Sequence, residues 1–216
     1  MKTLSYTQEY FLCAVNSMMK AHFAWNSAFP ACLVVGGIKE LLDNEYIVSV
    51  GNGDLVACKK WDEGLAYLKP LFQTIMTLRR YSDDKGIVGV FASTLNSSRY
   101  DDLFDAVGDS LVQSRYAEVA SEFGTSKKKM KYQPKAEAVK SVIDRFRAEL
   151  ARDGTLPEET ICLLALLDKS SLIRDYIGKS EMEIARRRIE ETKNSDIYAF
   201  ADAVINCCDD IAVAAM

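Results

Sequence analysis

Lysines are concentrated in one short stretch of this chain, residues 127–140 (KKKMKYQPKAEAVK), which holds six lysines and one acid. The chain as a whole has 216 residues and a net charge of −4, so this stretch is opposite in sign to its surroundings. Such a cluster attracts anionic lipid surfaces, but charge runs are also ordinary solvated surface, and lysines protect strand edges from aggregation. The stretch is therefore a candidate binding surface, with a plain structural alternative.

Residue types that usually carry catalysis are sparse. His22 is the only histidine, and the six cysteines show no Cys-x-x-Cys spacing, so neither a zinc site nor a nucleophile–base pair has enough donors. The chain also lacks a glycine-rich phosphate loop and a nucleophile-elbow motif. We therefore expect no enzyme, no metal and no cofactor, and we expect the cysteines in apolar segments to be buried reduced thiols.

Apolar residues recur mostly at helical spacing, and Ser5 and Gln8 have the capping-box spacing that begins a helix. Only two segments alternate as strands do, residues 46–59 and 117–133. The sequence predicts a mostly α fold, one helical domain over residues 1–216 around the central apolar helix Ile161–Leu167, with two small β-hairpins. We expect the second hairpin to protrude.

A helix followed by a hairpin occurs twice, which resembles a winged helix. A recognition helix should be basic, whereas the two candidate helices, PACLVVGGIKELLDNE and YDDLFDAVGDSLVQSR, carry more acids than bases. No nucleic-acid partner is therefore expected. The three arginines 186–188 lie among glutamates, which favours a salt-bridged helix face over a binding site. The lack of a long apolar run and of a signal peptide predicts a cytoplasmic chain, with membrane attachment limited to the periphery.

Four segments resemble the Golgi phosphoprotein-three family of Golgi vesicle adaptors and their bacterial relatives. They are LSYTQEYFLCAV, ACLVVGGIKELLDNEYI, SLVQSRYAEV with its hairpin, and DGTLPEETICLLALLDKSSLIRDYI, in family order over most of the chain. The resemblance implies a helical fold around a central apolar helix. It also implies a protruding hairpin, here about residues 117–133, that mediates oligomerisation.

The resemblance further implies a shallow pocket for phosphatidylinositol 4-phosphate, built from a tryptophan after the first helix and several arginines. Trp25 matches the tryptophan, whereas the expected arginine positions hold Pro30, Asp101 and Phe104. An acid facing a phosphate group repels it, so this pocket is expected to be degenerate. The residues expected to meet anionic lipid are Trp25, Lys127, Lys128, Lys129 and Lys131.

The functional prediction is a non-enzymatic adaptor of this type that binds a phosphoinositide or another anionic membrane lipid. The alternatives are a helical oligomerisation scaffold without lipid activity and, third, a winged-helix regulator. A protruding hairpin leaves apolar side chains that a second copy of the chain could bury, which predicts a homo-oligomer through residues 117–133. The apolar residues expected there are Tyr116, Val119, Phe123, Met130 and Tyr132.

Overall fold

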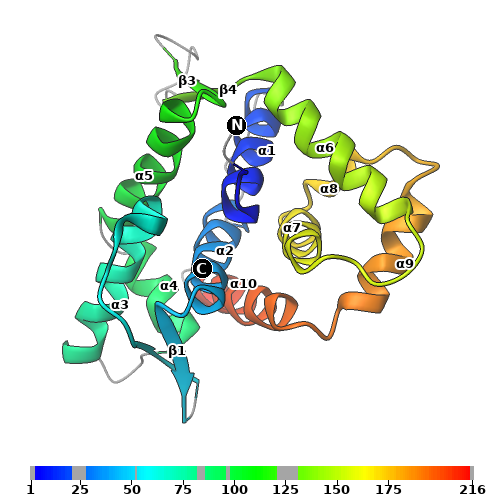
Figure 1. Cartoon of the computed structure of the whole chain (residues 1–216). Coiled ribbons are helices and arrows are strands. Elements are labelled where there is room, and N and C mark those ends of the chain that lie inside the picture. Colours follow the sequence, from blue (N-terminus) through cyan, green and yellow to red (C-terminus); the bar gives the residue numbers. More distant parts are fainter. Residues whose placement is uncertain are drawn as a thin grey trace. The chain divides into compact units, whose positions relative to one another are not determined.

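A computed structural model describes residues 3–20, 28–51, 53–81, 86–95, 98–120 and 131–214. Within these ranges the chain forms ten α-helices, one 3-10 helix and two antiparallel two-stranded sheets (Figure 1). The predicted fold class, mostly α with two small hairpins, is confirmed. None of the described helices combines the length and the apolar composition that a bilayer span requires.

The chain divides into two compact units, and each unit is assembled from two separate stretches of sequence. Unit 1 comprises residues 1–26 and 108–194, and unit 2 comprises residues 27–107 and 195–216. The division falls inside the helix α5 (Arg99–Gln113). Whether both units form the single domain that we expected stays a prediction.

Unit 1 packs around α7 (Glu158–Lys169), the apolar helix predicted to be central. Every residue of α7 from Cys162 to Leu167 is at most 1% exposed, and the helix contacts α1, α8 and α9. Glu158 and Glu159 lie in its first turn, where the helix dipole favours negative charge. The other elements of unit 1 are α1 (Tyr6–Lys20), β3 (Ala117–Val119), β4 (Tyr132–Pro134), α6 (Ala136–Ala151), α8 (Ile173–Tyr176) and α9 (Met182–Thr192).

The start of α1 is held by the predicted capping box. The backbone amide of Gln8 donates to Oγ of Ser5 at 3.3 Å, and the amide of Ser5 donates to Oε1 of Gln8 at 3.2 Å. Each side chain therefore satisfies an amide that has no partner inside the helix. This fixes where α1 begins, and α1 then packs against α6, α7 and β4.

Arg188 on α9 has a buried role besides the ion pair that the sequence predicts. Its side chain is 6% exposed and donates to the backbone carbonyls of Leu150, Arg152 and Gly154 at the end of α6. The last carbonyls of a helix lack intrahelical donors, and a guanidinium has five N–H groups to offer. Arg188 thus joins α9 to the end of α6, and both Arg187 and Arg188 also form the expected ion pairs with Glu191.

Unit 2 packs around α2 (Ala28–Asp43), in which every residue from Phe29 to Leu41 is buried. It contacts α3, α4, α10 and β1. After the hairpin of unit 2, a 3-10 helix is followed by a separate α-helix with Pro70 in its first turn, where no amide donor is needed. The other elements of unit 2 are β1 (Ile47–Val50), β2 (Asp54–Ala57), the 3-10 helix η1 (Glu63–Leu68), α3 (Lys69–Tyr81), α4 (Ile87–Leu95) and α10 (Asp196–Ala214).

The predicted repetition of helix and hairpin extends to individual hydrogen bonds. Both α2 and α5 end in a Schellman motif, with a residue of positive φ at the bend, Glu45 (φ 57°) in the first copy and Arg115 (φ 66°) in the second. The bonds of the first copy are Tyr46 N to Leu41 O (2.9 Å) and Glu45 N to Leu42 O (3.0 Å), and those of the second are Tyr116 N to Leu111 O (2.8 Å) and Arg115 N to Val112 O (3.0 Å).

The hairpins that follow are also closed in the same way. In the first, the amide of Cys58 donates to the carbonyl of Tyr46 at 3.0 Å, and in the second the amide of Lys135 donates to the carbonyl of Tyr116 at 2.9 Å. Four pairs of facing residues, here called rungs, follow in each hairpin. In the second hairpin the fourth rung is Ala120 with Lys131, joined by a bond from Ala120 N to Lys131 O at 2.9 Å. In their backbone pairing, the two hairpins therefore differ only beyond the fourth rung.

Candidate functional site

The second hairpin is the longer of the two, although both are closed alike. Beyond the fourth rung, the first hairpin turns within residues 51–53, whereas the second continues for ten residues, 121–130. These ten residues, SEFGTSKKKM, contain three lysines and one acid. A three-residue turn closes such a hairpin, so the seven additional residues are not needed to join the strands. We call residues 121–130 the basic connection.

Tyr132 holds the second hairpin to unit 1. Its side chain is fully buried, and its ring meets that of Phe11 edge-on, with the ring centroids 6.0 Å apart. The hydroxyl donates to Oδ1 of Asp109 at 2.7 Å, and the ring lies over Gly108, where a side chain would collide with it. The end of the hairpin next to the helices is therefore part of the core of unit 1. The strands on either side of the basic connection are anchored to the unit through Tyr132.

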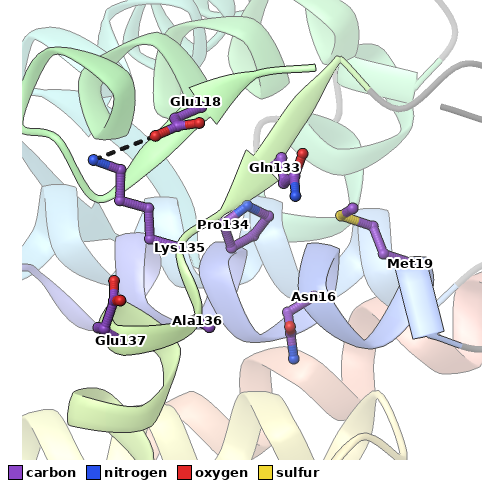
Figure 2. A pocket seen from close by; sticks show the side chains of 8 residues that line it. All are labelled: Asn16, Met19, Glu118, Gln133, Pro134, Lys135, Ala136 and Glu137. Atoms are coloured by element: carbon purple, nitrogen blue, oxygen red, sulfur yellow. Dashed lines mark ion pairs between the residues drawn. The ribbon is translucent and has the colours of Figure 1, made fainter. Parts of the chain in front are cut away.

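A hollow of about 570 Å³, here called the hairpin hollow, lies beside these strands (Figure 2). Asn16 and Met19 of α1 line one side, and Gln133 of β4 lines another. Glu118 and Lys135 face each other at 3.5 Å across the strands. Two acids, Glu118 and Glu137, line this hollow against one base, Lys135, so it has no surplus of positive charge for an anionic ligand.

A second hollow in unit 1, of about 420 Å³, is lined by three basic side chains from different parts of the sequence. We call it the arginine hollow. Arg115 comes from the bend after α5, Lys135 from the start of α6, and Arg145 from the middle of α6. Two acids, Glu9 and Glu137, also line it. Basic side chains therefore outnumber acidic ones.

Glu9 and Arg145 form an ion pair beside the arginine hollow. Nη2 of Arg145 lies 2.5 Å from Oε2 of Glu9, and its Nη1 lies 2.7 Å from Oε2 of Glu149. Burial raises the pKa of Glu9 to about 7, although the charge of Arg145 acts in the opposite direction. The positive charge of Arg145 is thus engaged by two carboxylates of its own unit.

Most residues predicted to bind lipid lie outside the described ranges, namely Trp25, Lys127, Lys128 and Lys129. Lys131 is described: it is exposed at the start of the returning strand, and its ammonium lies 5.2 Å from the centroid of the Tyr132 ring. The described part of the hairpin therefore places one predicted lysine at the surface, directly after the basic connection.

The predicted oligomerisation residues divide into two groups. Phe123 and Met130 lie outside the described ranges, and Val119 is 58% exposed, as an intermolecular contact requires. Tyr116 is 9% exposed and Tyr132 is fully buried within the chain's own fold. Expecting these two tyrosines on an outward apolar face was wrong, because strand alternation alone does not show that the hairpin packs on α1 and α5.

Positions where the family resemblance expects arginine have other roles here. Pro30 is buried in α2, and Asp101 is exposed in the first turn of α5. The ring of Phe104 packs edge-on against Phe29, with centroids 6.2 Å apart. None of the three offers a positive charge to a phosphate group, and the degeneracy of that pocket stays a prediction.

Among the described residues, neither helix that precedes a hairpin suits a winged-helix role. α2 is buried from Phe29 to Leu41 and therefore has no face for a DNA groove. The first turn of α5 exposes Asp101 and Asp102, which phosphates repel. Both helices that precede a hairpin are thus unsuitable, for different reasons.

Sequence reasoning missed the arginine hollow. Arg115 carried one available signal, its position two residues after α5 ends, where a helix commonly stops in a left-handed residue. Glu9 and Arg145 are 136 positions apart, and no local pattern pairs residues at that distance. In the described ranges, no group of three histidines, cysteines or acids is placed to hold a metal ion.

Comparisons with known proteins add no further constraint, since neither a scan against protein-family models nor a search of curated proteins finds a match to this chain. The resemblance to the Golgi phosphoprotein-three family accordingly rests on the four segments quoted above.

Proposed function

We propose that this chain is a non-enzymatic adaptor that binds an anionic membrane surface through the basic connection of its second hairpin. Lys127, Lys128, Lys129 and Lys131 meet the lipid headgroups in this arrangement, and Trp25 is a second candidate contact. Phosphatidylinositol 4-phosphate is one anionic lipid that the surface can meet, as the family resemblance implies. The pocket described for that family contributes little, because its arginine positions are occupied by Pro30, Asp101 and Phe104.

One observation carries the proposal, namely the difference between two hairpins that are otherwise built alike. Both follow a Schellman motif and are closed by equivalent hydrogen bonds, yet only the second has seven additional residues. Those residues belong to the most basic stretch of an acidic chain. Because the addition is unnecessary for closing the hairpin, a role outside the fold is the simpler explanation for its length and charge.

The expected strength follows from the number of lysines. A lysine near an anionic membrane contributes about 1 kcal/mol at physiological ionic strength, so three lysines contribute roughly 3 kcal/mol, or a factor of about 100 in partitioning. This attraction extends over a Debye length of about 8 Å in 0.15 M salt and weakens as salt is added. A surface of this kind binds membranes reversibly and tolerates several anionic lipids.

Co-sedimentation with vesicles tests the proposal. Vesicles of phosphatidylcholine alone, with phosphatidylserine, or with phosphatidylinositol 4-phosphate are mixed with three proteins: the unchanged chain, a shortened-hairpin variant and a matched control. The shortened-hairpin variant replaces residues 121–130 with Gly-Asn-Gly, the turn of the first hairpin. The control combines Lys59→Ala with Lys60→Ala, which removes exposed charge from the end of the first hairpin.

We expect binding to phosphatidylserine vesicles to fall roughly 100-fold in the shortened-hairpin variant and to change little in the control. Added salt should weaken the binding of the unchanged chain. If the shortened variant binds as well as the unchanged chain, the basic connection is not the site. If Trp25→Ala lost vesicle binding with the lysines intact, and if salt did not weaken the binding of the unchanged chain, Trp25 would be the contact instead.

The second candidate is a helical oligomerisation scaffold, which the 58% exposure of Val119 favours. A two-stranded hairpin with an exposed apolar residue gains stability when a second copy covers it. Light scattering at tens of micromolar protein, roughly the range of weak standard-size interfaces, tests this idea. We expect a dimer or tetramer that becomes a folded monomer in the shortened-hairpin variant, and a monomeric unchanged chain would refute the scaffold.

A further inference from the structure

We propose that the arginine hollow binds a phosphate monoester, with Arg115 and Lys135 as its principal cationic contacts. The hollow lies wholly within unit 1, and none of the residues that the lipid-binding proposal invokes lines it. The inference therefore goes beyond the adaptor role and does not depend on it. The three basic groups of the hollow differ in how far the fold itself engages their charges.

Arg115 has a charge that the fold does not use. Neither an ion pair nor a side-chain hydrogen bond engages its guanidinium among the described residues, and the residue is exposed next to the hollow. Arg145 differs, because Glu9 and Glu149 already bind it. A guanidinium without a partner, at the edge of a concave surface, offers two parallel N–H donors of the spacing that phosphate oxygens accept.

Lys135 is the second cation with charge to spare. Its only described ion pair is the 3.5 Å contact with Glu118, a side chain that is 68% exposed. A contact of that length between exposed groups stabilises little, so the ammonium is free to turn toward a ligand at small cost. Lys135 and Arg115 reach the same hollow from the two ends of the second hairpin, one after β4 and the other before β3.

Charge and size then define the ligand. Arg145 is already engaged by Glu9 and Glu149, so the positive charge available to a ligand comes from Arg115 and Lys135, with Glu137 as the one other acid in the lining. Burial raises the pKa of Glu9 to about 7, so its protonation adds net positive charge as the pH falls below 7. A doubly charged monoester uses two cations, whereas a carboxylate needs only one. At about 420 Å³ the hollow also exceeds a bare phosphate and falls in the range of small-molecule sites, which leaves room for the alcohol part of the ester.

Backbone conformation at Arg115 provides a variant that removes the charge without weakening the fold. At φ 66°, glycine is the less strained residue, so Arg115→Gly should fold at least as well as the unchanged chain. Glu45 occupies the equivalent bend of the first hairpin at φ 57°, and it lines neither the arginine hollow nor the hairpin hollow. Glu45→Gly is therefore a matched control, with the same backbone change and no loss of positive charge.

Two kinds of probe separate the possible sources of the monoester. Glycerol 3-phosphate, titrated by calorimetry, represents a soluble ester, and phosphatidic acid in phosphatidylcholine vesicles represents a lipid. We expect Arg115→Gly to weaken binding of at least one probe about tenfold or more, the value of one charge-assisted hydrogen bond. Glu45→Gly should leave the affinity for both probes within about twofold of the unchanged chain.

Three results would overturn the inference: neither probe binds the unchanged chain, Arg115→Gly binds both as well as the unchanged chain, or Glu45→Gly loses binding to the same extent. The shortened-hairpin variant keeps this test separate from the adaptor proposal. It retains Arg115 and Lys135, so it should still bind glycerol 3-phosphate or phosphatidic acid, and equal loss there would count against the arginine hollow. Arg115→Gly should conversely retain binding to phosphatidylserine vesicles, which contain no monoester.

Discussion

Substituting Gly108 with alanine tests how the second hairpin is attached to unit 1. A Cβ atom at this position would lie 2.3 Å from Cε2 of Tyr132 and 2.5 Å from its Cδ2 and Cζ, whereas ordinary contacts begin near 3.4 Å. The ring must therefore move by about 1 Å. It is fully buried against Phe11 and donates to Asp109 at 2.7 Å, so that movement disturbs both interactions.

Two opposing effects determine how much Gly108→Ala changes the free energy of unfolding. Overpacking of a core typically costs about 1–3 kcal/mol, and a weakened hydrogen bond from the Tyr132 hydroxyl adds roughly 1 kcal/mol. Replacing glycine by alanine inside a helix returns about 1 kcal/mol. We expect Gly108→Ala to lower the free energy of unfolding by about 1–3 kcal/mol, although glycine is the weaker helix former.

Urea unfolding of four proteins measures both effects: the unchanged chain, Gly108→Ala, Tyr132→Ala and the double variant. Tyr132→Ala alone should cost about 3–5 kcal/mol, as for other large aromatic residues in a core. With the ring removed, Gly108→Ala should become stabilising by up to about 1 kcal/mol. The sign of one substitution thus depends on the residue present at a second position.

The same sign in both backgrounds would refute this reasoning. If Gly108→Ala stabilised the chain with Tyr132 present, the ring would not lie over the helix as described. If it destabilised the chain with Tyr132 removed, the strain would come from a source other than the ring. Equal m-values among the four proteins would show that the differences reflect stability rather than a change in the unfolded state.

Three further predictions use the same measurement. Arg188→Met should cost about 3–5 kcal/mol, because it leaves several carbonyls at the end of α6 without donors; a cost below about 1 kcal/mol would show that water replaces the guanidinium. Ser5→Ala should cost about 1 kcal/mol through loss of the capping box, and a neutral result would mean that the start of α1 needs no cap. Glu9 has a higher pKa in the folded chain, about 7, than its ordinary value of 4.5, so its contribution to stability is complete below pH 4.5 and is lost as the pH rises to 7. The decline should be on the order of 3 kcal/mol, and Glu9→Gln should remove it; an unchanged profile in that variant would assign the decline to other groups.

Helices and hairpins were predictable from the sequence because their signals are local. The alternation in residues 46–59 and the turn at 51–53 specify the first hairpin, and Ser5 with Gln8 specifies the start of α1. The repetition of helix and hairpin was also visible. The Schellman motifs behind this repetition were not predictable, because both bends have a charged residue where glycine is the usual signal.

The candidate site was predicted only in part, because it depends on contacts between distant segments. Sequence alternation treats Tyr132 as one face of a strand, and nothing local indicates that Gly108 provides space for its ring. The charged neighbours of Arg188 predicted its ion pair with Glu191, while its three backbone partners lie 34–38 positions away. In each case the deciding partner is a backbone group or a small residue, which leaves no charge or hydrophobic pattern to detect.

The two-segment construction of each unit has a consequence for synthesis on the ribosome. The apolar helix α2 packs against α10, which begins about 150 residues later in the chain. At about 5–20 residues per second, α10 follows α2 by roughly 8–30 seconds, far longer than the time a helix or a hairpin takes to form. During this interval one side of α2 has no native cover, so a nascent chain is most vulnerable to aggregation after α2 has emerged and before α10 does. A chaperone that recognises exposed apolar helices should therefore associate with chains stalled between these two helices and release them once α10 is available.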